Sequence, residues 1–111
     1  MPKTFHYDTI NAAKVEEGAF NVKIRWLITK DIGAKNFAMR LIEIGKNGYT
    51  PLHTHNWEHE VFVLGGEGTI SDGEVQTQLR SGDVVFVAPN EKHQFKNQGK
   101  KSLKFICLIP C

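Results

Sequence analysis

Four of the five histidines in this chain have the spacing that a metal site built on β-strands requires. His53, His55 and His59 lie in the run HTHNWEH, and His93 lies in a distant segment, within EKHQF. Neutral imidazole is the commonest protein ligand for transition metals, and a site needs three or four ligand atoms converging on one point. These four histidines are therefore predicted to bind one divalent metal ion, whereas His6 has no histidine neighbours and is interpreted as a surface residue.

β-strand periodicity would bring the four rings together. Side chains two apart on a strand project from the same face, so His53 and His55 are predicted to share one face, about 7 Å apart. His59 follows a short bend through Trp57 and is expected to begin the next strand, with its ring turned back toward the first two. His93 would complete the site from a remote segment of a closed sheet.

The same alternation separates the histidines from two nearby carboxylates. If His59 faces the interior, then Val61 and Val63 face it as well, while Glu58 and Glu60 face away. The glutamates are therefore interpreted as outward-facing residues or as hydrogen-bond partners of the ligands, and not as ligands themselves.

The rest of the chain reads as short strands separated by turns. Runs rich in Val, Ile, Phe and Thr alternate with turn signals about every eight to twelve residues, which is typical of an all-β sandwich or barrel. In NVKIRWL, Val22, Ile24 and Trp26 form one apolar face. Asp72-Gly73 is a strong signal for a tight hairpin turn, since both positions of that turn favour positive φ. The run DVVFVA is apolar on both faces and is predicted to be covered on both.

Composition limits the class of protein. The chain has 111 residues, enough for one domain over 1–111, and its formal charge of +2 comes from scattered residues, 14 basic and 12 acidic. This balance predicts no nucleic-acid or membrane partner, and the absence of a signal-like segment predicts a cytoplasmic protein. Cys107 and Cys111 are about 13 Å apart if extended, so free thiols are expected, which fit a reducing compartment.

The histidine segments resemble the two motifs of the cupin superfamily. The first motif, roughly G-x5-H-x-H-x3/4-E-x6-G, is similar to GYTPLHTHNWEHEVFVLGG, with His53, His55 and Gly66 in place. His59 stands at the glutamate position, and Gly48 lies one residue closer to His53 than in the motif. The resemblance implies a small jelly-roll β-barrel that holds a metal at its mouth.

The second motif, G-x5-P-x-G-x2-H-x3-N, is similar to GDVVFVAPNEKHQFKN. Gly82, His93 and Asn97 match, while Ala88 and Asn90 stand where the pattern has proline and glycine. Asn is an intelligible substitute because, after glycine, it best tolerates the left-handed conformation that the turn needs.

With histidine at the glutamate position, the chain resembles the compact single-domain four-histidine cupins, which are associated with manganese. The motif-bearing core then covers about 37–109. Residues 1–36 would supply N-terminal strands and a segment that two subunits could exchange, because such barrels usually pair as homodimers. The resemblance favours Mn or Fe, although imidazole also accepts Zn, Ni and Cu.

Four neutral imidazoles would leave a divalent ion with its full charge, and therefore with strong affinity for anions. Two open positions would let a small-molecule substrate coordinate the metal. The pocket above it is predicted, by strand parity, to be lined by Phe95, Phe105, Cys107 and Ile109, and Arg40 is a further candidate without a parity argument; ordinary core packing is the alternative for each. No general base is identified, and the catalytic residues stay unknown.

These features favour a metal-dependent oxidoreductase, dioxygenase-like or peroxide-using, acting on a small organic compound. Two alternatives stay open. One is a non-redox isomerase or decarboxylase, which would normally need a positioned acid or base. The other is a non-catalytic module that binds a metal or a small ligand.

Overall fold

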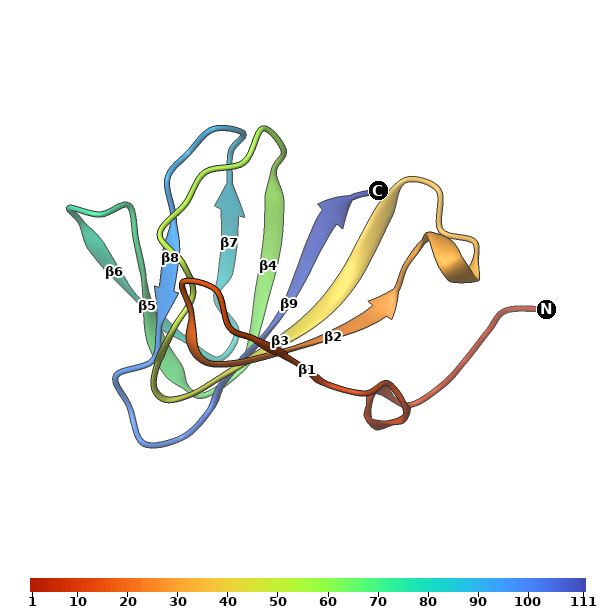
Figure 1. The fold of residues 1–111 in the computed structure, drawn as a ribbon, viewed down its shortest axis with the longest axis horizontal. Helices are drawn as coiled ribbons and strands as arrows, with labels where there is room; N and C mark the ends of the chain where they lie inside the picture. The colour runs from red at the N-terminus through yellow and green to blue at the C-terminus, as the bar shows by residue number, and fades with distance from the viewer.

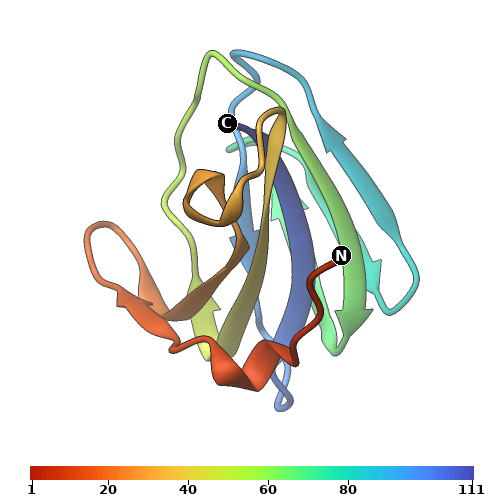
Figure 2. The ribbon, with the colours of Figure 1, turned by 90° about the vertical axis from the view of Figure 1, so that its right-hand side faces the viewer.

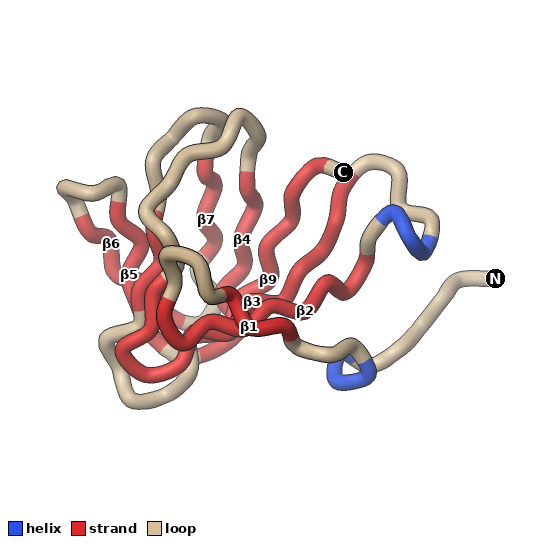
Figure 3. Tube along the Cα trace, in the orientation of Figure 1, coloured by secondary structure: helices blue, strands red, loops and turns tan.

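The computed structural model describes residues 1–111, and nearly all of its regular structure is β-strand (Figures 1 and 3). Two single turns of 3-10 helix, η1 and η2, lie near the N-terminus, and no helix is long and apolar enough to cross a membrane. The elements in chain order are η1 (Tyr7–Thr9), β1 (Ala13–Val15), β2 (Phe20–Ile28), η2 (Lys30–Ile32), β3 (Phe37–Tyr49), β4 (His59–Gly65), β5 (Glu67–Ser71), β6 (Gln76–Arg80), β7 (Val84–Val87), β8 (Gln94–Lys96) and β9 (Leu103–Pro110).

The strands form one curled antiparallel sheet in the order β6-β5-β8-β3-β9-β4-β7, with β2 and then β1 added along β3. The long strand β3 connects the two halves, because residues 37–44 pair with β9 and Tyr49 pairs with β8. Figure 2 shows the sheet curving around an interior. The predicted all-β jelly-roll fold is confirmed.

Side chains on the inner face of this sheet form the core. Ile44, Val63, Leu103 and Phe105 are completely buried, and the stacked rings of Phe95 and Phe105 lie 4.5 Å apart between centroids. Residues of four strands thus meet at one centre. The complete core cluster consists of Val22, Ile42, Ile44, Val61, Val63, Leu79, Phe95, Leu103, Phe105 and Cys107.

Strand parity in β4 is as predicted. His59, Val61 and Val63 are buried, whereas Phe62 and Leu64 are about half exposed on the outer face. β4 therefore begins at the histidine and points its ring inward.

The expectation that the run DVVFVA is covered on both faces is wrong for the single chain. Val87 is buried, but Val84 and Phe86 on the opposite face are 73% and 59% exposed. The physical reason is topological: β7 lies at one end of the sheet, and no layer of this chain covers its outer face.

The hairpin between β5 and β6 is confirmed, but its turn is longer than two residues. Ser71 pairs with Gln76, so the loop covers 72–75, and only Gly73 has positive φ. The Asp72 carboxylate accepts hydrogen bonds from the backbone N–H groups of Glu74 and Val75, at 2.9 and 2.8 Å. These bonds stabilise the longer turn and hold the pKa of Asp72 below its ordinary value.

Two positions of the motifs need unusual backbone angles. Gly66 has φ +80°, and a Cβ there would overlap the carbonyl oxygen of Ser102, so only glycine fits. Asn90 has φ 66°, the left-handed conformation predicted for it. The turns that flank the histidine segments are thus determined locally by residue type.

Candidate metal centre

The segment that carries the first two histidines is held by the backbone rather than by a regular strand. His53 forms one isolated bridge with His93, in which each N–H donates to the other's carbonyl oxygen, at 3.2 and 3.0 Å. The Asn90 N–H donates to the His55 carbonyl oxygen at 2.6 Å. The expectation of a continuous strand through His53 and His55 is therefore wrong, because this stretch pairs at only one position.

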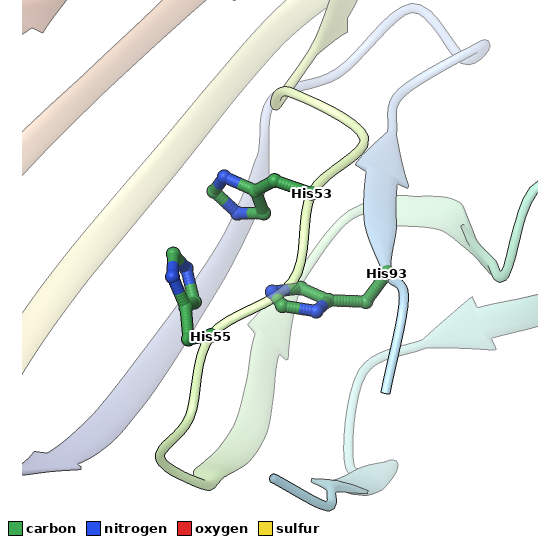
Figure 4. Close-up of side chains that lie close together, drawn as sticks. All are labelled: His53, His55 and His93. Atoms are coloured by element: carbon green, nitrogen blue, oxygen red, sulfur yellow. The ribbon is translucent and has the colours of Figure 1, made fainter. Parts of the chain in front are cut away.

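Three of the predicted ligands lie together (Figure 4). His53 and His55 come from this segment and His93 from the chain just before β8, and their ligand atoms all lie within 4.8 Å of one another. Two nitrogen atoms bound to one ion at about 2.1 Å are at most about 4.2 Å apart. Small ring rotations would therefore let all three bind one ion, and these three residues can hold a metal.

His59 lies beside this group, on β4. Its ring centroid is 4.8 Å from that of His93 and 5.1 Å from that of His55. The residue is 6% exposed, and its Nε2 atom is buried without any hydrogen-bond partner. A buried nitrogen without a partner is costly unless something binds it, so the donor set fits a divalent metal ion.

Neighbouring groups orient the rings. His93 Nδ1 lies 3.0 Å from the carbonyl oxygen of Glu91; because this oxygen can only accept, Nδ1–H donates the hydrogen bond and Nε2 is left as the free acceptor. His55 stacks on Trp57 with centroids 4.3 Å apart and planes 6° apart. His59 Nδ1 lies 3.3 Å from the Cys107 sulfur.

A mostly apolar cavity of about 300 Å³ opens beside the histidines. Of the predicted pocket residues, Arg40, Phe95, Phe105 and Cys107 line it, together with all four histidines. Ile109 does not line it and packs at the margin of the core instead. Its position near the end of β9 takes it beyond the cavity, although its parity matches that of Cys107.

Part of the cavity lining comes from β1 and β2, which the sequence did not assign to the pocket. Val15, Ile24 and Trp26 line the cavity from these strands, and Thr50 and Pro51 add to the lining. The alternation in NVKIRWL contained the signal, since it placed Ile24 and Trp26 on one apolar face, but it did not indicate what that face covers.

Arg40 extends its guanidinium group from β3 into this cavity. Nη2 donates to the Cys107 sulfur at 2.9 Å and lies 3.4 Å from Nδ1 of His59. The guanidinium carbon lies 5.4 Å from the centroid of the Trp26 ring, within the range of a cation–π contact. The cavity thus contains one permanent positive charge.

Burial and this charge lower the pKa values of His53, His55 and His59. Loss of solvation is the largest cause that lowers the pKa of His53 to about 4 and that of His59 to about 3, and it also lowers the pKa of His55. Neighbouring histidines and Arg40 add to each shift. Near neutral pH, His53 and His59 are therefore in the deprotonated form that metal ligands require.

These shifts predict an acid-sensitive metal-free protein. Histidines of the unfolded chain titrate near pH 6.5. Below that pH the unfolded chain therefore binds protons that His53 and His59 do not bind in the folded protein, and acid favours unfolding. The free energy of unfolding should be highest above about pH 7 and fall by about 2–4 kcal/mol toward pH 4, about half of what the two shifts give without the solvent screening that partly exposed rings receive. Urea titrations at each pH, followed by tryptophan fluorescence, measure this. His59→Gln should flatten the slope and His6→Gln should not; equal slopes in all three proteins would contradict the assignment.

Comparison with known proteins agrees with this geometry. The family model described as "Cupin domain" matches residues 40–109. An oxalate-binding protein of Thermotoga maritima is 30% identical over 96 residues, which cover 83% of this chain and 78% of that protein. Among solved structures, the polyketide cyclase RemF from Streptomyces resistomycificus has a TM-score of 0.93 and 32% identity, covering all of this chain and 80% of that one. A predicted oxalate decarboxylase of Thermotoga maritima has a TM-score of 0.86 at 24% identity, covering 97% of this chain and 98% of that one, and shows the shared fold.

Proposed function

This chain belongs to the cupin family, and on that premise we propose that it is a metal-dependent enzyme acting on a small organic substrate, an oxidoreductase of the dioxygenase-like or peroxide-using kind. The observation that carries the proposal is the cluster of imidazole rings at an apolar cavity, with Nε2 of His59 buried and unpartnered.

The proposed ligands are His53, His55 and His93, with His59 as the fourth. The contact between His59 Nδ1 and the Cys107 sulfur is compatible with this set: with the proton on Nδ1, donated to the sulfur, Nε2 is available for the ion. An ion held by four neutral ligands would supply Lewis acidity and, as manganese or iron, one-electron chemistry. This set corresponds to the four-histidine cupins, with Mn or Fe favoured and Zn, Ni or Cu also compatible with imidazole.

The residues of the cavity favour redox chemistry over acid–base chemistry. No carboxylate, lysine or tyrosine lines it, so no side chain of that kind is placed to move a proton at the substrate. Phe95 and Phe105 form an apolar wall that excludes water. The chain itself would bind and orient the substrate while the metal supplied the reactivity.

A second candidate is non-redox chemistry, such as isomerisation, decarboxylation or cyclisation. The 32% identity to a protein named as a polyketide cyclase favours it, as does the Arg40 guanidinium, which can stabilise an enolate. A third candidate, a non-catalytic binding module, is favoured by the relative named as an oxalate-binding protein.

Metal substitution separates these candidates. The purified protein would be loaded with Mn, Fe, Cu or Zn and tested on β-diketones and catechols, with oxygen, peroxide and substrate consumption measured together. We expect turnover with Mn or Fe and none with Zn, because Zn has no accessible redox change. Turnover with Zn, without oxidant consumption, would support the second candidate, and no turnover with any metal would contradict both enzymatic proposals. His53→Ala is the inactive control.

We also propose that the chain forms a homodimer. The outer face of β4 and β7 exposes four large apolar side chains, Phe62, Leu64, Val84 and Phe86, and an exposed apolar patch of this kind marks an interaction site. A second copy would cover it, as the two-sided apolar pattern of β7 predicts. Light scattering should give twice the mass of one chain, and Phe86→Glu should shift it to one chain; a monomeric wild-type protein would contradict the proposal.

A further inference from the structure

We propose that Arg40 recognises the negative charge of the substrate, and that the cavity takes a small organic anion with an apolar body, such as an aromatic carboxylate or enolate. The inference rests on the proposed function only in taking this cavity as the substrate site. It assigns a substrate class and a specificity-determining residue to that site.

Arg40 lacks a counter-ion. No aspartate or glutamate lines the cavity, and the one ion pair of the structure joins His6 and Asp8 instead. The Nε atom of Arg40 is buried without a hydrogen-bond partner. Its Nη2 atom contacts only the Cys107 sulfur and a ring nitrogen of His59.

An unpaired charge in an apolar site is unfavourable unless a ligand of opposite charge pairs with it. Arg40 is partly buried, with its Nε atom withdrawn from water, and a guanidinium that loses water without gaining an anionic partner costs stability. An arginine can usually extend its long side chain to water, but stacking against Trp26 keeps the Arg40 guanidinium at the cavity. Its planar set of N–H donors matches the two oxygen atoms of a carboxylate. The missing partner is therefore an anion.

The apolar lining of the cavity indicates the rest of the ligand. The cavity, about 300 Å³, is mostly apolar, and its lining includes the Phe95 and Phe105 rings together with Val15 and Ile24. A dianion as small as oxalate would fill little of it and would leave the walls in contact with water. An aromatic or branched apolar body would bury these walls, and such burial drives binding.

The test uses benzoate as the probe, with benzamide as its neutral counterpart, on the full-length protein kept metal-free with a chelator. Isothermal titration and the shifts of histidine and tryptophan NMR signals report binding. We expect benzoate to bind at least tenfold more tightly than benzamide and more tightly than oxalate. Arg40→Gln should lower benzoate affinity at least tenfold and leave benzamide affinity unchanged. Arg40→Lys should restore part of the benzoate affinity, and the exposed control Arg80→Gln should not change it.

Thermal unfolding without ligand separates recognition from a structural role. An uncompensated charge predicts that Arg40→Gln unfolds at the same or a higher temperature, whereas a structural arginine predicts a lower one. Equal benzoate affinity in wild type and Arg40→Gln, tighter binding of oxalate, or a lower unfolding temperature with parallel loss of both probes would overturn the proposal. Mn²⁺ affinity is measured separately: anion binding without metal binding would contradict the proposed function alone, and metal binding without anion selectivity would contradict this inference alone.

Discussion

Alanine in place of His93 should lower the affinity of the protein for Mn²⁺ by at least about 100-fold, because loss of a ligand costs more than loss of a group that merely orients one. The fold should persist, since the bridge between residues 53 and 93 is made by backbone atoms that the substitution leaves in place. Isothermal titration of the metal-free variant, with circular dichroism to check folding, measures this.

His59→Ala distinguishes a four-histidine site from a three-histidine one. If Nε2 of His59 binds the ion, this variant should lose Mn²⁺ affinity to a similar extent as His93→Ala. Glu60→Gln is the matched control, because Glu60 is exposed on the opposite face of β4 and should bind Mn²⁺ like the wild type. A strong loss in Glu60→Gln, or none in His59→Ala, would contradict the proposed ligand set.

Asn97→Ala should destabilise the protein by about 3 kcal/mol or more, the largest loss of stability that we predict for one polar side chain. Asn97 is completely buried, and its amide connects three backbone groups. Its Nδ2 donates to the carbonyl oxygens of Ile44 and Lys101, both at 2.8 Å, and its Oδ1 accepts from the N–H of Gly99 at 2.9 Å. Alanine would remove all three bonds and would leave the carbonyl oxygen of Ile44 buried without this partner.

Chemical denaturation measured by fluorescence and by circular dichroism tests this prediction. Asn97→Asp should also be strongly destabilising, because a carboxylate keeps the bond from Gly99 but cannot donate to the two carbonyl oxygens. Gln98→Ala, next to it and exposed, should change stability by less than about 0.5 kcal/mol. A neutral effect of Asn97→Ala would show that water replaces the amide.

The sequence by itself determined the features that depend on neighbouring residues. The alternation that turns His59, Val61 and Val63 inward follows from strand geometry alone, and the left-handed turn at Asn90 follows from what its side chain tolerates. The jelly-roll fold and the clustering of the histidines could likewise be predicted, because glycine and histidine occur in two segments at the spacing of the two cupin motifs.

Only the tertiary structure decided which predicted faces are covered and which residues meet. Strand parity placed Phe105, Cys107 and Ile109 on one face, yet only the first two reach the cavity, because its extent depends on the curvature of the sheet. The Arg40 guanidinium at Cys107, and the exposed outer face of β7, depend on pairings between segments far apart in the chain. Local periodicity specifies the direction of a side chain relative to its own strand, but what lies opposite is decided by how remote strands pair and curve.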